Sequence, residues 1–149
     1  MKGLFHTVTP WHSAHAYVSA AVLLQDDLGR ISIHFRDDFE NVLARGTWGY
    51  FSGGVKDSET LTDAAIRELY EETGIHAGAD ELKPIAKAYC NETPEGAHHY
   101  IFLLERCVKS SDICLNEGAG FAFIHKDQID SFTLQPVVHR VLKYYFKVT

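Results

Sequence analysis

The sequence feature that most restricts the fold is a nearly continuous run of apolar residues at positions 17–24. A strand that is apolar on both sides must be covered on both faces, so it belongs inside a sheet that lies between two other layers. Two helices are predicted to supply those layers, one over residues 60–74 and one over residues 136–146. We therefore predict an α/β (α+β) fold in which a mixed β-sheet lies between helices.

Local signals define the two helices. Thr60 can cap the central helix, with Asp63 as the reciprocal partner of a capping box, and Gly74 supplies a stop after its last turn. The C-terminal helix begins at Pro136, a residue suited to a first turn. The 149 residues suit a single domain over positions 1–149, with residues 1–16 as an irregular N-terminal arm.

The remaining strands are predicted from alternation and from turn residues. Residues 30–36 alternate as the half-exposed partner of a hairpin with residues 17–24, which places Ser32 and His34 on the exposed side. A short strand over residues 47–51 runs into Gly53 and Gly54, where we predict a turn that requires positive φ. Further strands are predicted over residues 82–89, 97–107 and 120–125.

Three carboxylates gather on the central helix. Successive helix residues advance by about 100°, so Glu68, Glu71 and Glu72 share an arc of roughly 100°. They repel one another and lie towards the helix C-terminus, where the helix dipole disfavours anions. A divalent cation relieves both penalties, and an all-oxygen site favours Mg²⁺ first and Mn²⁺ second. We therefore predict a metal site here.

The segment from Gly53 to Ile75 resembles the Nudix box, which is a glycine, five residues, a glutamate, seven residues and then an Arg-Glu-aliphatic-x-Glu-Glu-x-Gly-aliphatic run. Every fixed position is matched without a gap. The matching residues are Gly53, Glu59, Arg67, Glu68, Leu69, Glu71, Glu72, Gly74 and Ile75. The box covers 23 residues, and the order of the strands around it is also similar to that of the Nudix fold, an α/β/α sandwich.

The resemblance implies a set of site residues. Glu68, Glu71 and Glu72 are expected to bind the metal together with the carbonyl of Ser52, which stands where the family usually has another glycine. Arg67 is expected to brace Glu59 or a neighbouring glutamate by a bidentate contact. The expected catalytic residues are Glu71, Glu72, Arg67 and Glu117; the expected substrate contacts are Gly53, Gly54, Arg36 and Phe51; Glu59 and Gly74 are expected to be structural.

The identity of the catalytic base stays open at this point. Glu117 is the leading candidate because it lies on an acidic, glycine-containing loop ahead of the strand at 120–125, and Glu92 and Glu95 are weaker candidates. Glu71 or Glu72 could itself serve. The histidines show no metal-ligand spacing; His34, His98 and His99 are the ones that could line a substrate groove.

Composition excludes several classes of protein. The net charge of −6 and the absence of a basic run argue against a nucleic-acid partner. No apolar stretch is long enough to span a bilayer, so no membrane partner is expected. Cys90, Cys107 and Cys114 form no C-x-x-C pair, which favours free thiols and a cytoplasmic location. The resemblance suggests a homodimer, in which the N-terminal arm could exchange between subunits.

The first functional hypothesis is metal-dependent hydrolysis of a nucleoside diphosphate linked to another group, with a (deoxy)nucleoside triphosphate as the preferred small-molecule substrate. A nucleotide-sugar or ADP-ribose hydrolase is the alternative within this class. An isomerase of isopentenyl-type diphosphates is disfavoured because no cysteine matches its motif. A non-catalytic nucleotide-binding domain is a third class, but such domains usually lose box glutamates, and this chain keeps all of them.

Overall fold

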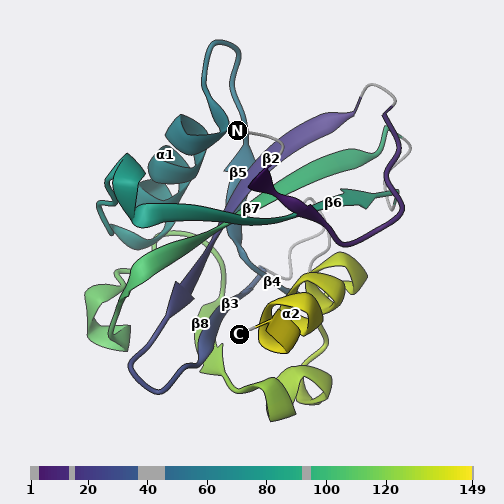
Figure 1. Cartoon of the computed structure of the whole chain (residues 1–149). Coiled ribbons are helices and arrows are strands. Elements are labelled where there is room, and N and C mark those ends of the chain that lie inside the picture. Colours follow the sequence, from purple (N-terminus) through teal and green to yellow (C-terminus); the bar gives the residue numbers. More distant parts are fainter. Residues whose placement is uncertain (1–3, 14–15, 37–45, 92–94, 149) are drawn as a thin grey trace.

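The computed structural model describes residues 4–13, 16–36, 46–91 and 95–148, and it has the predicted layered architecture (Figure 1). The described residues form a sheet of eight strands in the order β1-β6-β7-β2-β3-β4, in which β5 also pairs with β2 and β8 with β3. The strands are β1 (His6–Thr7), β2 (Tyr17–Gln25), β3 (Ile31–Phe35), β4 (Trp48–Gly49), β5 (Phe51–Gly54), β6 (Leu82–Cys90), β7 (Ala97–Cys107) and β8 (Gly120–Ile124).

Two α-helices flank this sheet, as predicted. They are α1 (Leu61–Thr73) and α2 (Pro136–Val148), and three short 3-10 helices lie in the connections, η2 (Ala79–Glu81), η3 (Ser110–Asp112) and η4 (Lys126–Ser131). The sheet is mixed, because β2 pairs in parallel with β7 and antiparallel with β5. The fold class predicted from the sequence is therefore confirmed.

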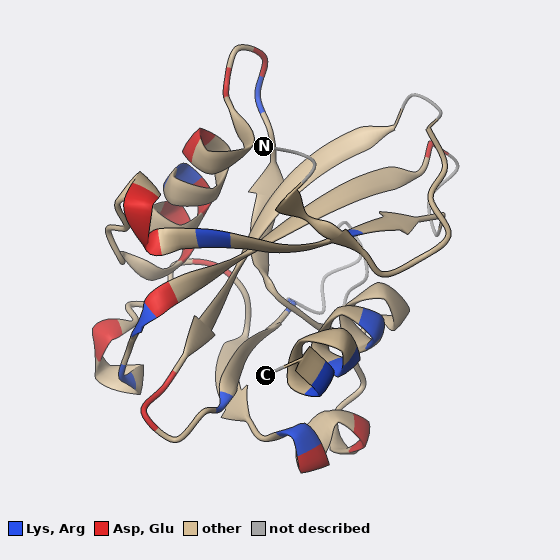
Figure 2. Cartoon of the chain, in the orientation of Figure 1, with Lys and Arg blue, Asp and Glu red and all other residues tan. Residues whose placement is uncertain are grey.

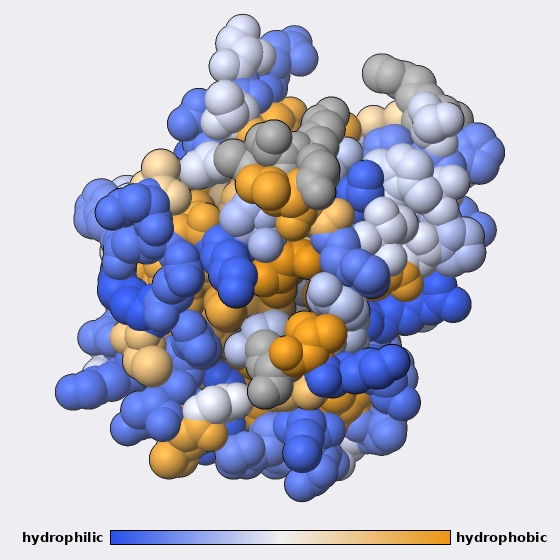
Figure 3. Space-filling model, viewed as in Figure 1, coloured by the Kyte–Doolittle hydropathy of each residue, from blue (hydrophilic) through white to orange (hydrophobic). Residues whose placement is uncertain are grey.

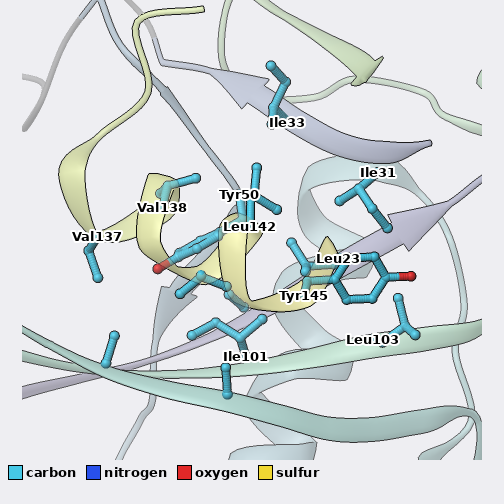
Figure 4. Packing of buried hydrophobic residues seen from close by; sticks show 14 of the residues in the cluster. Leu23, Ile31, Ile33, Tyr50, Ile101, Leu103, Val137, Val138, Leu142 and Tyr145 are labelled. Carbon is cyan, nitrogen blue, oxygen red and sulfur yellow. The ribbon is translucent and has the colours of Figure 1, made fainter. Parts of the chain in front are cut away.

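Strand β2 is the shared wall of two hydrophobic cores. Alternate residues of a strand point to opposite faces. Ala20 and Val22 lie in the core that contains Leu69 of α1. Ala21 and Leu23 lie in the core beneath α2, where the side chains of strands and helix point toward one another (Figure 4). The apolar run at 17–24 is therefore needed to hold both helical layers.

The predicted hairpin of β2 and β3 is present, but its two strands pair over a shorter length than predicted. Strands β2 and β3 share only the Gln25–Ile31 pair, and β3 pairs instead with β8 and β4. The face of β3 predicted to be half-exposed is covered, with Ser32 and His34 both buried. Ser32 accepts a hydrogen bond from the Leu24 backbone N–H at 2.9 Å, which satisfies a donor where the two strands separate.

The prediction of a wholly irregular N-terminal arm was also wrong. Residues 6 and 7 form β1, which pairs in parallel with β6. Phe5 is buried in the core beneath α1. Trp11 stacks on His98 with ring centroids 4.5 Å apart, and the Lys87 ammonium lies 4.5 Å above the Trp11 ring. The described part of the arm is thus fastened to the sheet by apolar burial, strand pairing and ring contacts.

Neither α-helix of the described residues is long or apolar enough to cross a bilayer, since each has 13 residues.

Candidate active site

Helix α1 carries the predicted glutamates and is closed at both ends by its own sequence. The Asp63 backbone N–H donates to Thr60 Oγ1 at 3.0 Å and the Thr60 N–H donates to Asp63 Oδ2 at 3.4 Å, which completes the capping box. At the other end Gly74 adopts a left-handed conformation with φ of 75°. Both predictions about the ends of this helix are confirmed.

A loop formed by residues 113–118, here called the capping loop, covers the C-terminal end of α1. The backbone N–H groups of Cys114 and Asn116 donate to the carbonyls of Thr73 and Glu72 at 2.9 and 3.0 Å. The Asn116 side-chain amide donates to the carbonyl of Glu71 at 3.1 Å. These bonds satisfy carbonyl groups that a helix end leaves without partners. They also bring the loop that contains Glu117 to the end of the helix that contains Glu72.

Arg67 ties the helix to the segment that precedes it. Its Nε and Nη2 atoms donate to the two carboxylate oxygens of Glu59 at 2.7 and 2.9 Å, and Nη2 also donates to the carbonyl of Gly54 at 2.9 Å. Glu59 in turn accepts from the Lys56 backbone N–H at 2.8 Å. The hydrogen bonds from Arg67 and Lys56 lower the pKa of Glu59 to about 2. The predicted bidentate brace is therefore present, and it fixes the loop between β5 and α1.

Arg67 also touches the acidic face of the helix. Its Nη1 atom donates to Glu68 Oε1 at 2.7 Å and lies 3.3 Å from Glu71 Oε2. Glu71 is the outermost of the three glutamates, with half of its side chain exposed. One guanidinium thus offsets part of the repulsion between two neighbouring carboxylates.

Gly53 and Gly54 are required by close approach. Neither has positive φ, so the predicted turn is wrong: both belong to β5, paired with Ala20 and Ser19. A Cβ atom on Gly53 would collide with the Glu68 carboxylate, and one on Gly54 would collide with the Tyr17 hydroxyl. The absence of side chains here lets Glu68 lie directly against the strand.

Replacing Gly53 with alanine is expected to lower kcat by at least about tenfold and to weaken Mg²⁺ binding, because the new methyl group occupies the place of the Glu68 carboxylate. The measurement is a Mg²⁺ titration of activity. Gly120→Ala is the matched control, since Gly120 lies in a strand and a Cβ there meets nothing within 4 Å. Equal Mg²⁺ dependence of both variants and the unmodified protein would refute this role for Gly53.

Glu72 is the most perturbed acid of the site. It is 3% exposed, and its Oε1 atom has no hydrogen-bond partner among the described residues. Burial raises the pKa of Glu72 to about 9, with further contributions from the charges of Glu117 and Glu68; Arg36 and a backbone hydrogen bond from Ser52 act in the opposite direction. A buried carboxyl in this state is strongly suited to bind a cation.

The charges that act on Glu72 show which residues the fold brings together. Glu117 on the capping loop and Glu68 one turn earlier on α1 are the two acids that raise the Glu72 pKa. Arg36, at the end of β3, is the cation that acts on it. The hydrogen bonds of the capping loop thus bring Glu117 to the end of the acidic helix, and the charge of Arg36 acts on Glu72. Glu92 lies outside the described residues, and Glu95 is exposed at the start of the turn before β7.

The predicted metal ligands do not form a ready-made cage. No three His, Cys, Asp or Glu side chains within the described ranges converge as a cation site. Glu68 instead pairs with Arg67 at 2.7 Å, and Glu71 lies 3.3 Å from the same guanidinium with half of its side chain exposed. The donor set nevertheless fits a hard cation, because the acids supply oxygen ligands. The buried Oε1 of Glu72 has no hydrogen-bond partner among the described residues, so a bound cation would satisfy it.

One predicted substrate contact takes a different role. Phe51 is 1% exposed and packs in the core beneath α1, with its ring stacked on His34 at a centroid distance of 4.7 Å. Its ring faces are therefore occupied by core neighbours, and Phe51 is corrected to a residue that supports the site. The sequence predicts a substrate contact here because it does not reveal which face of β5 is covered.

Two residues near the site were missed or undervalued. Tyr17 lies with its hydroxyl against Gly54, and partial burial together with the Glu68 charge raises its pKa. His34 was considered only for a substrate groove, but its Nδ1 atom lies 3.6 Å from Glu72 Oε2 in the buried part of the site. Finding Tyr17 and His34 from the sequence would require knowing which strands pair with β2 and β3. Local sequence patterns do not specify that pairing.

The sequence and the fold both match known proteins. The family model described as NUDIX domain matches residues 15–144. A curated RNA pyrophosphohydrolase of Sphingopyxis alaskensis is 31% identical over 107 aligned residues, which cover 63% of this chain and 65% of the relative. The chain thus spans slightly less than two thirds of that relative's length.

Solved structures share the fold at low sequence identity. A MutT protein from Methanosarcina mazei superposes with a TM-score of 0.76 at 19% identity, over 93% of this chain and 98% of that one. A bifunctional NMN adenylyltransferase/ADP ribose pyrophosphatase from Francisella tularensis, solved with AMP and a manganese ion, has a TM-score of 0.63 at 16% identity, over 93% of this chain and 43% of that one.

Proposed function

The chain belongs to the NUDIX family, and from this premise we propose that it is a divalent-metal-dependent hydrolase that cuts the diphosphate of a nucleotide, preferably a (deoxy)nucleoside triphosphate. The single observation that carries the proposal is the buried carboxyl of Glu72, whose Oε1 has no partner among the described residues and which lies beside Glu68 and Glu117. Such a group has no evident structural use and an evident use in binding a cation.

Glu68 and Glu72 would hold the cation, with Glu71 joining from the exposed side and the Ser52 carbonyl from β5. Mg²⁺ is the preferred ion and Mn²⁺ the second choice; support for the latter is the manganese ion in the Francisella tularensis structure. When bound, such an ion neutralises phosphate oxygens and lowers the pKa of a water molecule.

The other residues of the site supply position and charge. Arg67 holds the segment from Gly54 to Glu59 against α1, so that the ligands keep their places. The bare backbone of Gly53 and Gly54 admits the Glu68 carboxylate and the Tyr17 hydroxyl to the strand, and Arg36 offers a permanent positive charge to phosphate groups. Glu117, exposed on the capping loop, is the group proposed to accept the proton of the attacking water.

RNA is a second candidate substrate, although the net charge of −6 argues against a nucleic-acid partner. The curated relative is an RNA pyrophosphohydrolase. The chain also concentrates cations on the outer face of α2, which has no acidic residue (Figure 2). Hydrophilic and hydrophobic side chains lie next to each other in this region of the surface (Figure 3). The exposed cations are Arg140, Lys143 and Lys147. A polyanion longer than a nucleotide could contact them.

The decisive experiment is a phosphate-release screen with Mg²⁺ or Mn²⁺. The panel contains nucleoside triphosphates, oxidised nucleotides, nucleotide sugars, ADP-ribose, dinucleoside polyphosphates and triphosphorylated RNA. Cleavage of one class that disappears without metal and in Glu72→Gln is the expected result. Binding of a nucleotide without metal and without cleavage would favour the non-catalytic alternative and refute the proposed hydrolase.

A further inference from the structure

A buried histidine joins the capping loop to the sheet. His34 of β3 is 3% exposed, and its Nε2 lies 2.7 Å from the backbone carbonyl oxygen of Glu117, a residue 83 positions later in the chain. A carbonyl oxygen can only accept, so Nε2 carries the proton and donates it. The ring is held in place by its stacking on Phe51. The contact is therefore a hydrogen bond from a fixed ring to the backbone of the proposed base.

Neighbouring contacts support the same anchoring. The Ala119 N–H donates to the Phe35 carbonyl at 3.0 Å, one residue beyond His34. Gly118 has φ of 88°, and a Cβ there would collide with His34 Nε2, so a glycine is needed for the loop to approach the ring. At its other end the same loop is bonded to α1 through Cys114 and Asn116.

We infer that His34 is a positioning residue, whose ring fixes the Glu117 backbone so that the Glu117 side chain is held beside Glu72. This inference rests on the proposed function, because it gives Glu117 its task. A residue on a surface loop must lose backbone and side-chain conformational entropy before it can act at a defined place. The hydrogen bond from His34 fixes the backbone of Glu117 in advance, so less of this entropy is lost when the residue acts.

The first test is hydrogen–deuterium exchange of the capping loop, which needs no substrate. His34→Phe keeps a ring on Phe51 but removes the donor, whereas His34→Gln retains an amide N–H near the place of Nε2. We expect exchange of the loop amides to quicken by about tenfold or more in His34→Phe and to stay close to the original rate in His34→Gln. His6→Phe is the control, since His6 also stacks on an aromatic ring, that of Tyr144. Unchanged exchange in His34→Phe would overturn the anchoring.

The second test is a double-mutant cycle with the substrate identified by the screen. His34→Phe is expected to lower kcat by about tenfold with little change in KM, and His34→Gln to recover most of that loss. In a Glu117→Gln background the same His34→Phe change should alter kcat less than twofold, because the group that it positions is already gone. An equal loss in both backgrounds would overturn the inference.

The two failures can be told apart. If the unmodified protein cleaves no substrate, but His34→Phe quickens hydrogen exchange in the capping loop, then the proposed hydrolase fails and the anchoring stands. If Glu72→Gln abolishes cleavage while the cycle shows full additivity, the hydrolase stands and the role of His34 is refuted.

Discussion

Replacing Glu72 with glutamine is expected to lower kcat by at least about 10²-fold without unfolding the protein. Glutamine has the volume of glutamate and can accept the same backbone hydrogen bond from Ser52, but it cannot carry the negative charge that a cation requires. Steady-state kinetics with saturating Mg²⁺ and circular dichroism of the folded state are the measurements. Because the charge is used only when a metal and substrate are bound, kcat should fall more than KM rises.

Glu105→Gln is the matched control for this change. Glu105 is exposed on β7, so the same chemical exchange there should leave kcat within about twofold of the original value. Near-normal turnover of a folded Glu72→Gln protein would remove Glu72 from the mechanism and return the search to Glu68 and Glu71.

The second large effect concerns the stability of the metal-free protein. The pKa of Glu72 is about 9 in the folded state, mainly through burial, and its ordinary value is 4.5. Because the pKa is higher in the folded state, Glu72 makes its full contribution to the free energy of unfolding below pH 4.5, and this contribution is lost as the pH rises towards 9. Between pH 4.5 and 7 the loss in unfolding free energy is roughly 3 kcal/mol, at about 1.4 kcal/mol per pH unit.

Urea unfolding in the presence of a chelator, repeated across this pH range, measures the effect. Other titrating groups contribute alike to the original protein and to Glu72→Gln, so the difference between the two isolates Glu72. We expect the variant to gain relative stability as pH rises. A difference that stays constant from pH 4.5 to 7 would show that Glu72 is not protonated in the folded protein.

Much of the fold was predictable because its signals are local. The limits of α1 follow from Thr60, Asp63 and Gly74, and the burial of β2 on both faces follows from its apolar run. The bidentate contact between Arg67 and Glu59 was also predictable, because the two residues are only eight positions apart in the sequence. These features depend on residues that are close in sequence, where backbone geometry restricts the choices.

Other features depend on which distant segments meet, and the sequence did not reveal them. Alternation in β3 predicts exposure for Ser32 and His34, but both are buried, and His34 contacts Phe51 of β5, Glu72 of α1 and the backbone of Glu117. Gly53 and Gly54 were assigned to a turn because glycine pairs are common there; the structure uses them to admit Glu68 and Tyr17. The role of Glu117 as the catalytic base stays a prediction, and the contact between its backbone and His34 is one that no local pattern predicts.

The pairing of β2 with β7 has a consequence for how this protein folds. This pairing brings together Ser19 and His99, which are 80 positions apart in the sequence. The contact between His34 and Glu117 closes a loop of similar length, 83 residues. Closing a loop of about 80 residues opposes folding by roughly 4 kcal/mol, and α1, a helix of 13 residues, is itself only marginally stable without packing against the sheet. The acidic helix and the loop that brings Glu117 to its end thus both depend on long-range contacts. The complete constellation of acids therefore exists only in the fully folded chain, which ties the chemistry of this protein to its global cooperativity.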